Sequence, residues 1–232
     1  MKAKKKRLLY IAIPVILLIL IGIYMLYRFN YIPHKKYTNE DFGIEAYISQ
    51  NDQDSDGVDD QTDILNSAQE YLDTKPKYKS KYYAETGYPN DEYGVCTDVV
   101  ANAMKGAGYD LMWLVNQDIL KFPNDYQIEQ ADPCIDFRRV RNLDIYFQHT
   151  AISLTTDITE IQEWQPGDIV IWSNHIGIIA EHRNKKGIPF VLHNANPIQA
   201  FYEEDILETW GKVVGHYRVA RKHKSCEKIS CN

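Results

Sequence analysis

Hydrophobic positions near the start of the chain form one unbroken run. Leu8–Tyr27 is 20 residues long and carries no charge. As a helix it would span about 30 Å, which matches the hydrocarbon core of a bilayer. A secretory signal peptide has a shorter apolar region and small residues at a cleavage site, whereas bulky Tyr24–Arg28 close this run. The pattern predicts an uncleaved transmembrane anchor.

The charges around this run predict its orientation. Five basic residues lie within residues 1–7, so this tail is expected to stay in the cytoplasm under the positive-inside rule. Everything after Arg28 would then be extracytoplasmic. We expect a polar linker over 28–50, a single domain over 51–222 and a short C-terminal tail over 223–232.

Beyond the linker, the periodicity changes from helical to alternating. Apolar residues at helical spacing predict helices over 62–72 and 96–107, and shorter ones over 116–121 and 143–150. The turn Pro166-Gly167-Asp168 then opens a β-rich region, with strands expected over 169–172, 176–180, 190–193 and 213–219. Helices followed by an antiparallel sheet predict an α+β fold.

Charge and cysteine content narrow the function. Of the 26 Lys and Arg residues, six lie in 1–28, where there is no acidic residue, so the predicted domain is strongly acidic. Such a surface argues against nucleic acid or anionic lipid as the main partner and favours divalent cations. The four cysteines match no metal-ligand or disulfide-dense pattern. Cys226 and Cys231 can close a small loop, which would leave Cys96 and Cys134 as free thiols, the latter structural.

Carboxylates gather at the start of the domain in a D-x-D-x-D-G arrangement typical of calcium loops. Gly57 permits the sharp turn, and Asp63 stands where a longer Glu is usual, so the affinity is expected to be weak. The alternative is a solvated acidic linker. The predicted ligands of a structural Ca²⁺ are Asp52, Asp54, Asp56, the Val58 carbonyl, Asp60 and Asp63.

A cysteine and two histidines form a candidate catalytic set. Cys96 begins a predicted helix, where unpaired N–H groups and the helix dipole stabilise a thiolate. His175 heads one predicted strand and His193 ends the next, so a reversal at 184–187 would bring the two imidazoles side by side. A nucleophile, a base and an orienting group are the parts that covalent catalysis needs. Each residue alone also fits a structural role, as a core cysteine, a turn histidine and a buried strand histidine.

Four blocks of this sequence resemble the bacterial DUF1287 family, which is similar to the NlpC-type papain-like cell-wall peptidases and amidases. The blocks are G-V-C-T-D-V-V, D-F-R-R-V-R-N-L, W-Q-P-G-D-I-V and H-I-G-I-I, within about 52–219. The resemblance implies a papain-like fold, Cys96 as nucleophile, His175 as base and a polar third residue at His193, with Asn194 as runner-up. The helix start differs from the usual D-C-S of the peptidases, and the two histidines are further apart in sequence.

The combined expectation is a membrane-anchored cysteine peptidase or amidase that acts on peptidoglycan. Two alternatives remain open, namely a non-catalytic envelope-binding module stabilised by calcium and an acyltransferase with the same Cys-His pair. Arg139 beside Asp136 can be an internal ion pair or a fork for a substrate carboxylate, while Arg138 and Arg141 fit solvated positions.

Overall fold

The structure is a computed structural model that describes the backbone of residues 2–219 and the side chains of residue 10 and residues 12–219. It divides into two units, Met1–Lys35 and Lys36–Asn232. The first unit contains one helix, α1 (Lys2–Arg28). Within the part of the chain that the structure describes, no helix combines the length and apolar character needed to cross a bilayer. The side chains of the predicted cytoplasmic tail and the predicted C-terminal tail lie outside the described residues.

The second unit is built on an antiparallel sheet of six strands, so the α+β prediction is confirmed. The strand order is β3-β8-β4-β5-β6-β7, and each neighbouring pair is antiparallel. The strands are β3 (Ile152–Ser153), β4 (Ile169–Trp172), β5 (His175–Arg183), β6 (Pro189–Leu192), β7 (Glu203–Glu204) and β8 (Gly215–Arg218). The four predicted strands are β4, β5, β6 and β8; β3 and β7 were not predicted, since two-residue strands carry too little alternation.

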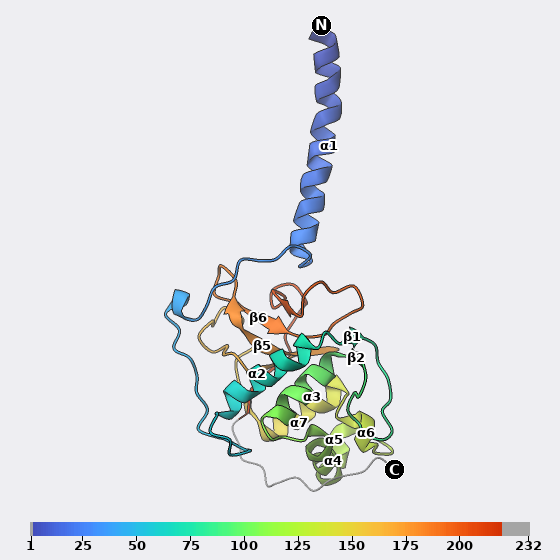
Figure 1. Cartoon of the computed structure of the whole chain (residues 1–232), viewed down its shortest axis with the longest axis vertical. Coiled ribbons are helices and arrows are strands. Elements are labelled where there is room, and N and C mark those ends of the chain that lie inside the picture. Colours follow the sequence, from blue (N-terminus) through green and yellow to red (C-terminus); the bar gives the residue numbers. More distant parts are fainter. Residues whose placement is uncertain (1, 220–232) are drawn as a thin grey trace. The chain divides into compact units, whose positions relative to one another are not determined.

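Helices cover one face of this sheet. The predicted helices correspond to α2 (Asp60–Asp73), α3 (Cys96–Gly106), α4 (Leu111–Lys121) and α7 (Val140–Thr150). Two one-turn helices, α5 (Pro123–Tyr126) and α6 (Pro133–Asp136), a short 3₁₀ helix, η1 (Glu40–Phe42), and a parallel pair, β1 (Lys77–Tyr78) and β2 (Tyr93–Gly94), complete the unit. Figure 1 shows α2 and α3 running side by side, with α4, α5 and α6 gathered at one end.

Two apolar cores lie on opposite faces of the sheet. Alternate strand residues such as Ile176, Ile178 and Leu192 pack against α2, α3 and α7. The intervening residues, including Trp172, Ile179 and Val191, pack under the loops of the other face. The period-two alternation of a strand explains why neighbouring residues serve different cores.

The segment from Lys36 onward belongs to the domain, whereas a linker was predicted as far as residue 50. Tyr37 forms a backbone bridge to Arg183 at the end of β5. The buried Arg183 guanidinium donates to Asn39 Oδ1 at 2.5 Å and to the Trp164 carbonyl at 2.5 Å. Gln165 Nε2 donates to the Glu45 carbonyl. These polar contacts hold a segment whose lack of apolar periodicity suggested a free connector.

The cysteines differ from their predicted states. Cys134 is disulfide-bonded, so the prediction of a free thiol there is wrong. Cys96 is the free, buried cysteine among the described residues. Cys226 and Cys231 lie outside the described residues.

Candidate active site

Cys96 is the first residue of α3, as its sequence context predicted. Val95, in an extended conformation, precedes the helix, and its N–H donates to Asp98 Oδ2 at 2.8 Å. The backbone N–H groups of Ile176 and Thr97 donate to the Cys96 sulfur, which lies at the boundary between α3 and β5. The helix start therefore surrounds the sulfur with backbone donors.

Burial dominates the ionisation of this thiol. Cys96 is 7% exposed, and its burial raises the pKa of the thiol to about 11 in spite of the three backbone N–H donors around the sulfur. We expected the helix start to stabilise a thiolate. In this structure desolvation outweighs the donors, so the resting cysteine is a neutral thiol at neutral pH.

His175 and His193 lie side by side, as predicted. His175 is the first residue of β5, His193 follows β6, and the two strands are antiparallel neighbours. His175 Nε2 lies 2.9 Å from His193 Nδ1. Gly177 permits this approach, because a Cβ there would lie 2.9 Å from the Leu192 carbonyl oxygen.

Both imidazoles are held neutral. His193 is fully buried and His175 is 5% exposed. Burial lowers the pKa of each to about 3, and the neighbouring His193 further lowers the pKa of His175. A neutral imidazole is the form that can accept a proton.

Cys96 and His175, the predicted nucleophile and base, share no hydrogen bond in the part of the chain that the structure describes. Among the described residues, the donor to the Cys96 sulfur from β5 is the N–H of Ile176, the residue after His175. The Nε2 atom of His175 is already engaged with His193, so Nδ1 is the ring nitrogen that this contact does not use. Catalytic hydrogen bonds are often long in free enzymes and tighten when substrate binds.

Asn194, the alternative prediction for the third catalytic residue, is hydrogen-bonded to two backbone carbonyls. Its amide donates to the carbonyls of Pro76 and Gly94 at 2.9 and 3.1 Å. These bonds tie the end of β6 to the segment that leads into Cys96. His193 is the residue that contacts His175.

Two residues of this site carried no recognisable signal in the sequence. Glu204 in β7 places Oε2 3.1 Å from His193 Nε2 and is itself buried. The Trp210 ring stacks on His175 with a centroid separation of 4.7 Å and stands at 86° to His193. Glu204 lies in a polar stretch without strand periodicity and Trp210 in a loop, so only the tertiary structure brings them to the histidines.

A buried ion pair supports the helix that carries Cys96. Arg138 Nε and Nη2 donate to the two carboxylate oxygens of Asp98 at 2.6 and 2.8 Å. Arg138 Nη1 also donates to the Lys81 carbonyl, and the Thr97 hydroxyl donates to the Arg138 carbonyl. Arg138 is 7% exposed, so the prediction that it is solvated is wrong.

Arg139 and Asp136 form the internal pair that was one of the two predictions. Arg139 Nη1 lies 3.6 Å from Asp136 Oδ1, with the arginine side chain half exposed and the aspartate buried. Asp136 Oδ2 accepts a hydrogen bond from the Asp132 N–H. The exposed guanidinium remains accessible, so a role for this pair in substrate binding stays a prediction.

Sequence comparison places these residues within a known family. Residues 65–219 match the profile described as "Domain of unknown function (DUF1287)". The chain belongs to the DUF1287 family. It is also 35% identical over 149 residues to the "Uncharacterized protein YijF" of Escherichia coli (strain K12), which covers 59% of this chain and 71% of that protein. No solved structure matches the chain.

The predicted calcium loop precedes the DUF1287 match, which begins at residue 65. Ligand oxygens of Asp52, Asp54 and Asp56 lie within 4.8 Å of one another. Asp52 accepts from the N–H groups of Asp56 and Gly57, and Asp56 accepts from Val58 N–H. The turn at Gly57, with φ of 95°, gathers the first three predicted ligands.

The later positions of the loop divide between two roles. Asp60 is fully buried, and its Oδ1 accepts from Gln53 N–H and its Oδ2 from the Tyr109 hydroxyl, so both oxygens already have hydrogen-bond partners and its role as a ligand stays a prediction. Asp63 is not one of the three carboxylates whose ligand oxygens converge, although the charges of Asp56 and Asp54 act on it. Its Oδ2 atom is buried without a hydrogen-bond partner, and burial followed by the charges of Asp56 and Asp54 raises its pKa to about 6. A cation beside these carboxylates would satisfy that oxygen and remove the repulsion.

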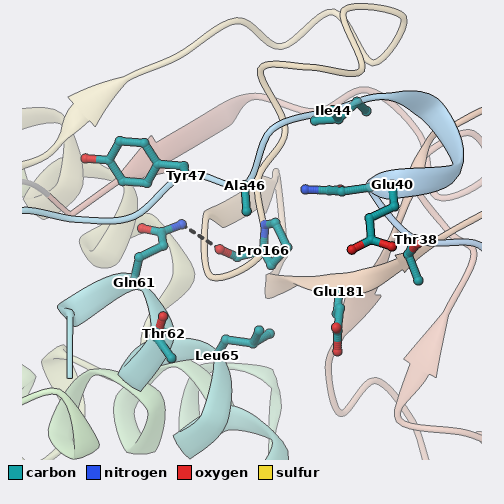
Figure 2. Close-up of a pocket in the computed structure, with 11 residues that line it drawn as sticks. Thr38, Glu40, Ile44, Ala46, Tyr47, Gln61, Thr62, Leu65, Pro166 and Glu181 are labelled. Carbon is teal, nitrogen blue, oxygen red and sulfur yellow. Dashed lines mark hydrogen bonds between the residues drawn. The ribbon is translucent and has the colours of Figure 1, made fainter.

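A cavity of about 450 Å³ lies elsewhere in this DUF1287 protein. It is lined by residues from the segment Thr38–Tyr47, by the first turns of α2, and by Pro166 and Glu181; Gln61 Nε2 donates to the Pro166 carbonyl at its wall (Figure 2). Glu181 is six residues after His175 along β5, a separation of about 20 Å in a strand. The cavity is therefore separate from the cysteine and the histidines.

Proposed function

We propose that this DUF1287 protein is a cysteine hydrolase that cleaves peptide or amide bonds, with peptidoglycan as its substrate. The observation that carries the proposal is the assembly of a free cysteine at a helix start, ringed by backbone N–H groups, beside a base histidine that a second histidine contacts. The resemblance to NlpC-type peptidases supports the same chemistry and a papain-like fold.

Acylation begins from the neutral pair. Nδ1 of His175 takes the thiol proton as the Cys96 sulfur bonds to the substrate carbonyl carbon, and the carbonyl electrons move onto oxygen. The backbone N–H groups at the start of α3 are suited to hold that oxyanion. The oxyanion then collapses, the carbon–nitrogen bond breaks, and the leaving amine takes the proton from His175. A thioester remains on Cys96.

Deacylation uses the same residues. Water attacks the thioester carbon and gives one proton to His175. The carbon–sulfur bond then breaks, and the sulfur recovers the proton. The products are a carboxylic acid and an amine, and the thiol and the neutral imidazole are restored.

Mass spectrometry of defined muropeptides tests the proposal. Incubation with the full-length protein should yield two fragments, and the sum of their masses should equal the mass of the substrate plus one water. The Cys96→Ala variant should yield no such fragments. Equal cleavage by the Cys96→Ala variant would exclude the mechanism. Intact substrate with both proteins would favour a binding module, and a product that carries an added amine would identify an acyltransferase.

We also propose that Asp52, Asp54, Asp56 and Asp63, with the Val58 carbonyl, hold a structural Ca²⁺. The unpartnered buried oxygen of Asp63 and the three converging carboxylates support this ligand set. The ion would supply positive charge that keeps the loop folded against the start of α2.

Removal of calcium should therefore lower the melting temperature of the protein. A ligand at a hundredfold excess over its dissociation constant stabilises by about 2.7 kcal/mol, so chelation should shift the transition by several degrees. The Asp63→Asn variant should lose most of this response. Asp73→Asn, at the other end of α2, is the matched control and should keep it. Identical melting curves of the native protein with calcium and with chelator would reject the site.

We propose an extracytoplasmic location with the N-terminal helix as anchor. The support is the uncharged run Leu8–Tyr27 behind a basic tail, together with the disulfide bond of Cys134, a feature of oxidising compartments. Protease added to intact spheroplasts should digest the domain, and its survival there would contradict this location.

A further inference from the structure

We propose that Glu204 is a positioning residue that sets the proton positions on both histidines and so leaves Nδ1 of His175 free to act as the base. The inference rests on the proposed function for its consequence, but the proton arrangement itself follows from contacts. The atoms form a chain, from Glu204 Oε2 to His193 Nε2 at 3.1 Å and from His193 Nδ1 to His175 Nε2 at 2.9 Å.

Gln199 removes the main ambiguity at His193. Its Oε1 accepts from Ala195 N–H at 2.7 Å, which fixes the orientation of the amide. Its Nε2 donates to the carbonyls of Phe201 and His193, at 2.7 and 3.2 Å. These two acceptors use both amide hydrogens. Gln199 Nε2 also lies 3.2 Å from His193 Nε2, but the two carbonyls can take both of its hydrogens, so the amide does not need the ring nitrogen as an acceptor.

The Glu204 carboxylate, in contrast, can form a hydrogen bond with His193 Nε2 only when that nitrogen carries a proton. We propose that Glu204 is ionised; an ionised carboxylate only accepts hydrogen bonds, and this places the His193 proton on Nε2. Its Nδ1 is then bare and accepts from His175, which must carry its own proton on Nε2. Since burial keeps His175 neutral, the second nitrogen, Nδ1, has no proton. That nitrogen is the one that must receive the Cys96 proton.

The reverse arrangement would disable the site. If Glu204 were replaced by a group that cannot accept, His193 could carry its proton on Nδ1 and donate it to His175 Nε2. His175 would then hold its own proton on Nδ1, so the nitrogen that must receive the Cys96 proton would already be occupied. The Glu204 charge also stabilises the imidazolium that forms when His175 accepts the thiol proton.

Glu203 provides the matched control on the same strand. Its carboxylate pairs with Lys36 and with His182 Nδ1 and does not reach the two site histidines. The side chains of adjacent strand residues point to opposite faces, so two neighbouring glutamates have different partners.

Nitrogen NMR of the full-length protein labelled in its histidine rings tests the proton positions directly. The expected result is a protonated Nε2 and a bare Nδ1 for both His175 and His193. In Glu204→Leu the bare Nδ1 of His175 should be partly or fully lost, and the rate at which iodoacetamide alkylates Cys96 should fall by about 10- to 100-fold. Glu203→Leu should change neither quantity.

Two results would overturn the inference. One is a His175 ring with its proton on Nδ1 in the native protein, a measurement that needs no variant to fold. The other is a Glu204→Leu variant with native proton positions and a native alkylation rate. Neither measurement uses a substrate, so failure of the muropeptide assay would leave the role of Glu204 standing, and the converse also holds.

Discussion

Replacement of His175 by alanine should lower the rate of substrate cleavage by about 10²- to 10⁴-fold, the usual contribution of a general base. Without the imidazole, the buried thiol has no acceptor for its proton, and burial holds the pKa of that thiol near 11. The effect should fall on kcat, because His175 is needed for the chemical step. Steady-state kinetics on a muropeptide that the native protein cleaves measures it.

Under the proposed mechanism, the same environment predicts the pH dependence of cleavage by the native protein. Burial depresses the pKa of His175, so the imidazole is protonated only at low pH and acts as a base throughout the neutral range. The rate should therefore not decline as the pH falls through about 6.5, the ordinary pKa of histidine. A titration of kcat with a midpoint near that ordinary value would contradict the buried, neutral base.

His182 is the matched control for His175. Both histidines lie in β5, but His182 is partly exposed and its Nδ1 contacts Glu203 at 2.7 Å, away from the cysteine. His182→Ala should leave the rate unchanged. Full activity in His175→Ala, or an equal loss in both variants, would remove His175 from the mechanism.

Replacement of Arg138 by methionine should destabilise the domain by about 3–5 kcal/mol, because it leaves the Asp98 carboxylate buried without its counter-charge. The pair is almost completely buried, with side-chain exposures of 1% for Arg138 and 0% for Asp98. In a domain of this size the loss corresponds to a fall in melting temperature of about 10 °C. Urea unfolding followed by circular dichroism measures the free energy of unfolding.

The neighbouring Arg139 is the control for the stability effect of Arg138. Arg139 is 54% exposed in its side chain and pairs with Asp136 at 3.6 Å, so Arg139→Met should cost no more than about 1 kcal/mol. The double variant Asp98→Leu/Arg138→Met should recover part of the loss, because it removes both buried charges. Equal effects of the two arginine variants would show that the buried pair contributes little to stability.

The sequence predicted the elements that carry strong periodicity. The apolar spacing of α2 and α3, and the runs that became β4, β5 and β6, identified the α+β class and the order of helices before strands. The short elements were not predicted, because β7 has two residues and α5 and α6 have one turn each, which is too short to show a periodic pattern. The same lack of pattern made residues 36–50 look like a linker, although polar contacts to Arg183 and Gln165 bind them to the domain.

For the site, the sequence by itself determined where the reactive side chains stand along the chain. The start of a helix at Cys96 and a strand reversal between His175 and His193 are local properties. They follow from the spacing of apolar residues and from the turn residues between the strands. The partners of these groups were decided only by the tertiary structure. Glu204 meets His193, Trp210 covers His175, and Arg138 neutralises Asp98 because distant segments pack together.

The protonation states of the site residues were also decided only by the tertiary structure. The helix start at Cys96 indicated a stabilised thiolate, yet the pKa of the thiol is raised, because desolvation depends on everything that packs around the sulfur. In the same way, the sequence predicted all five carboxylates of the aspartate-rich loop as ligands. Packing alone turned Asp60 toward Tyr109 and left Asp63 with a buried oxygen that a cation would satisfy.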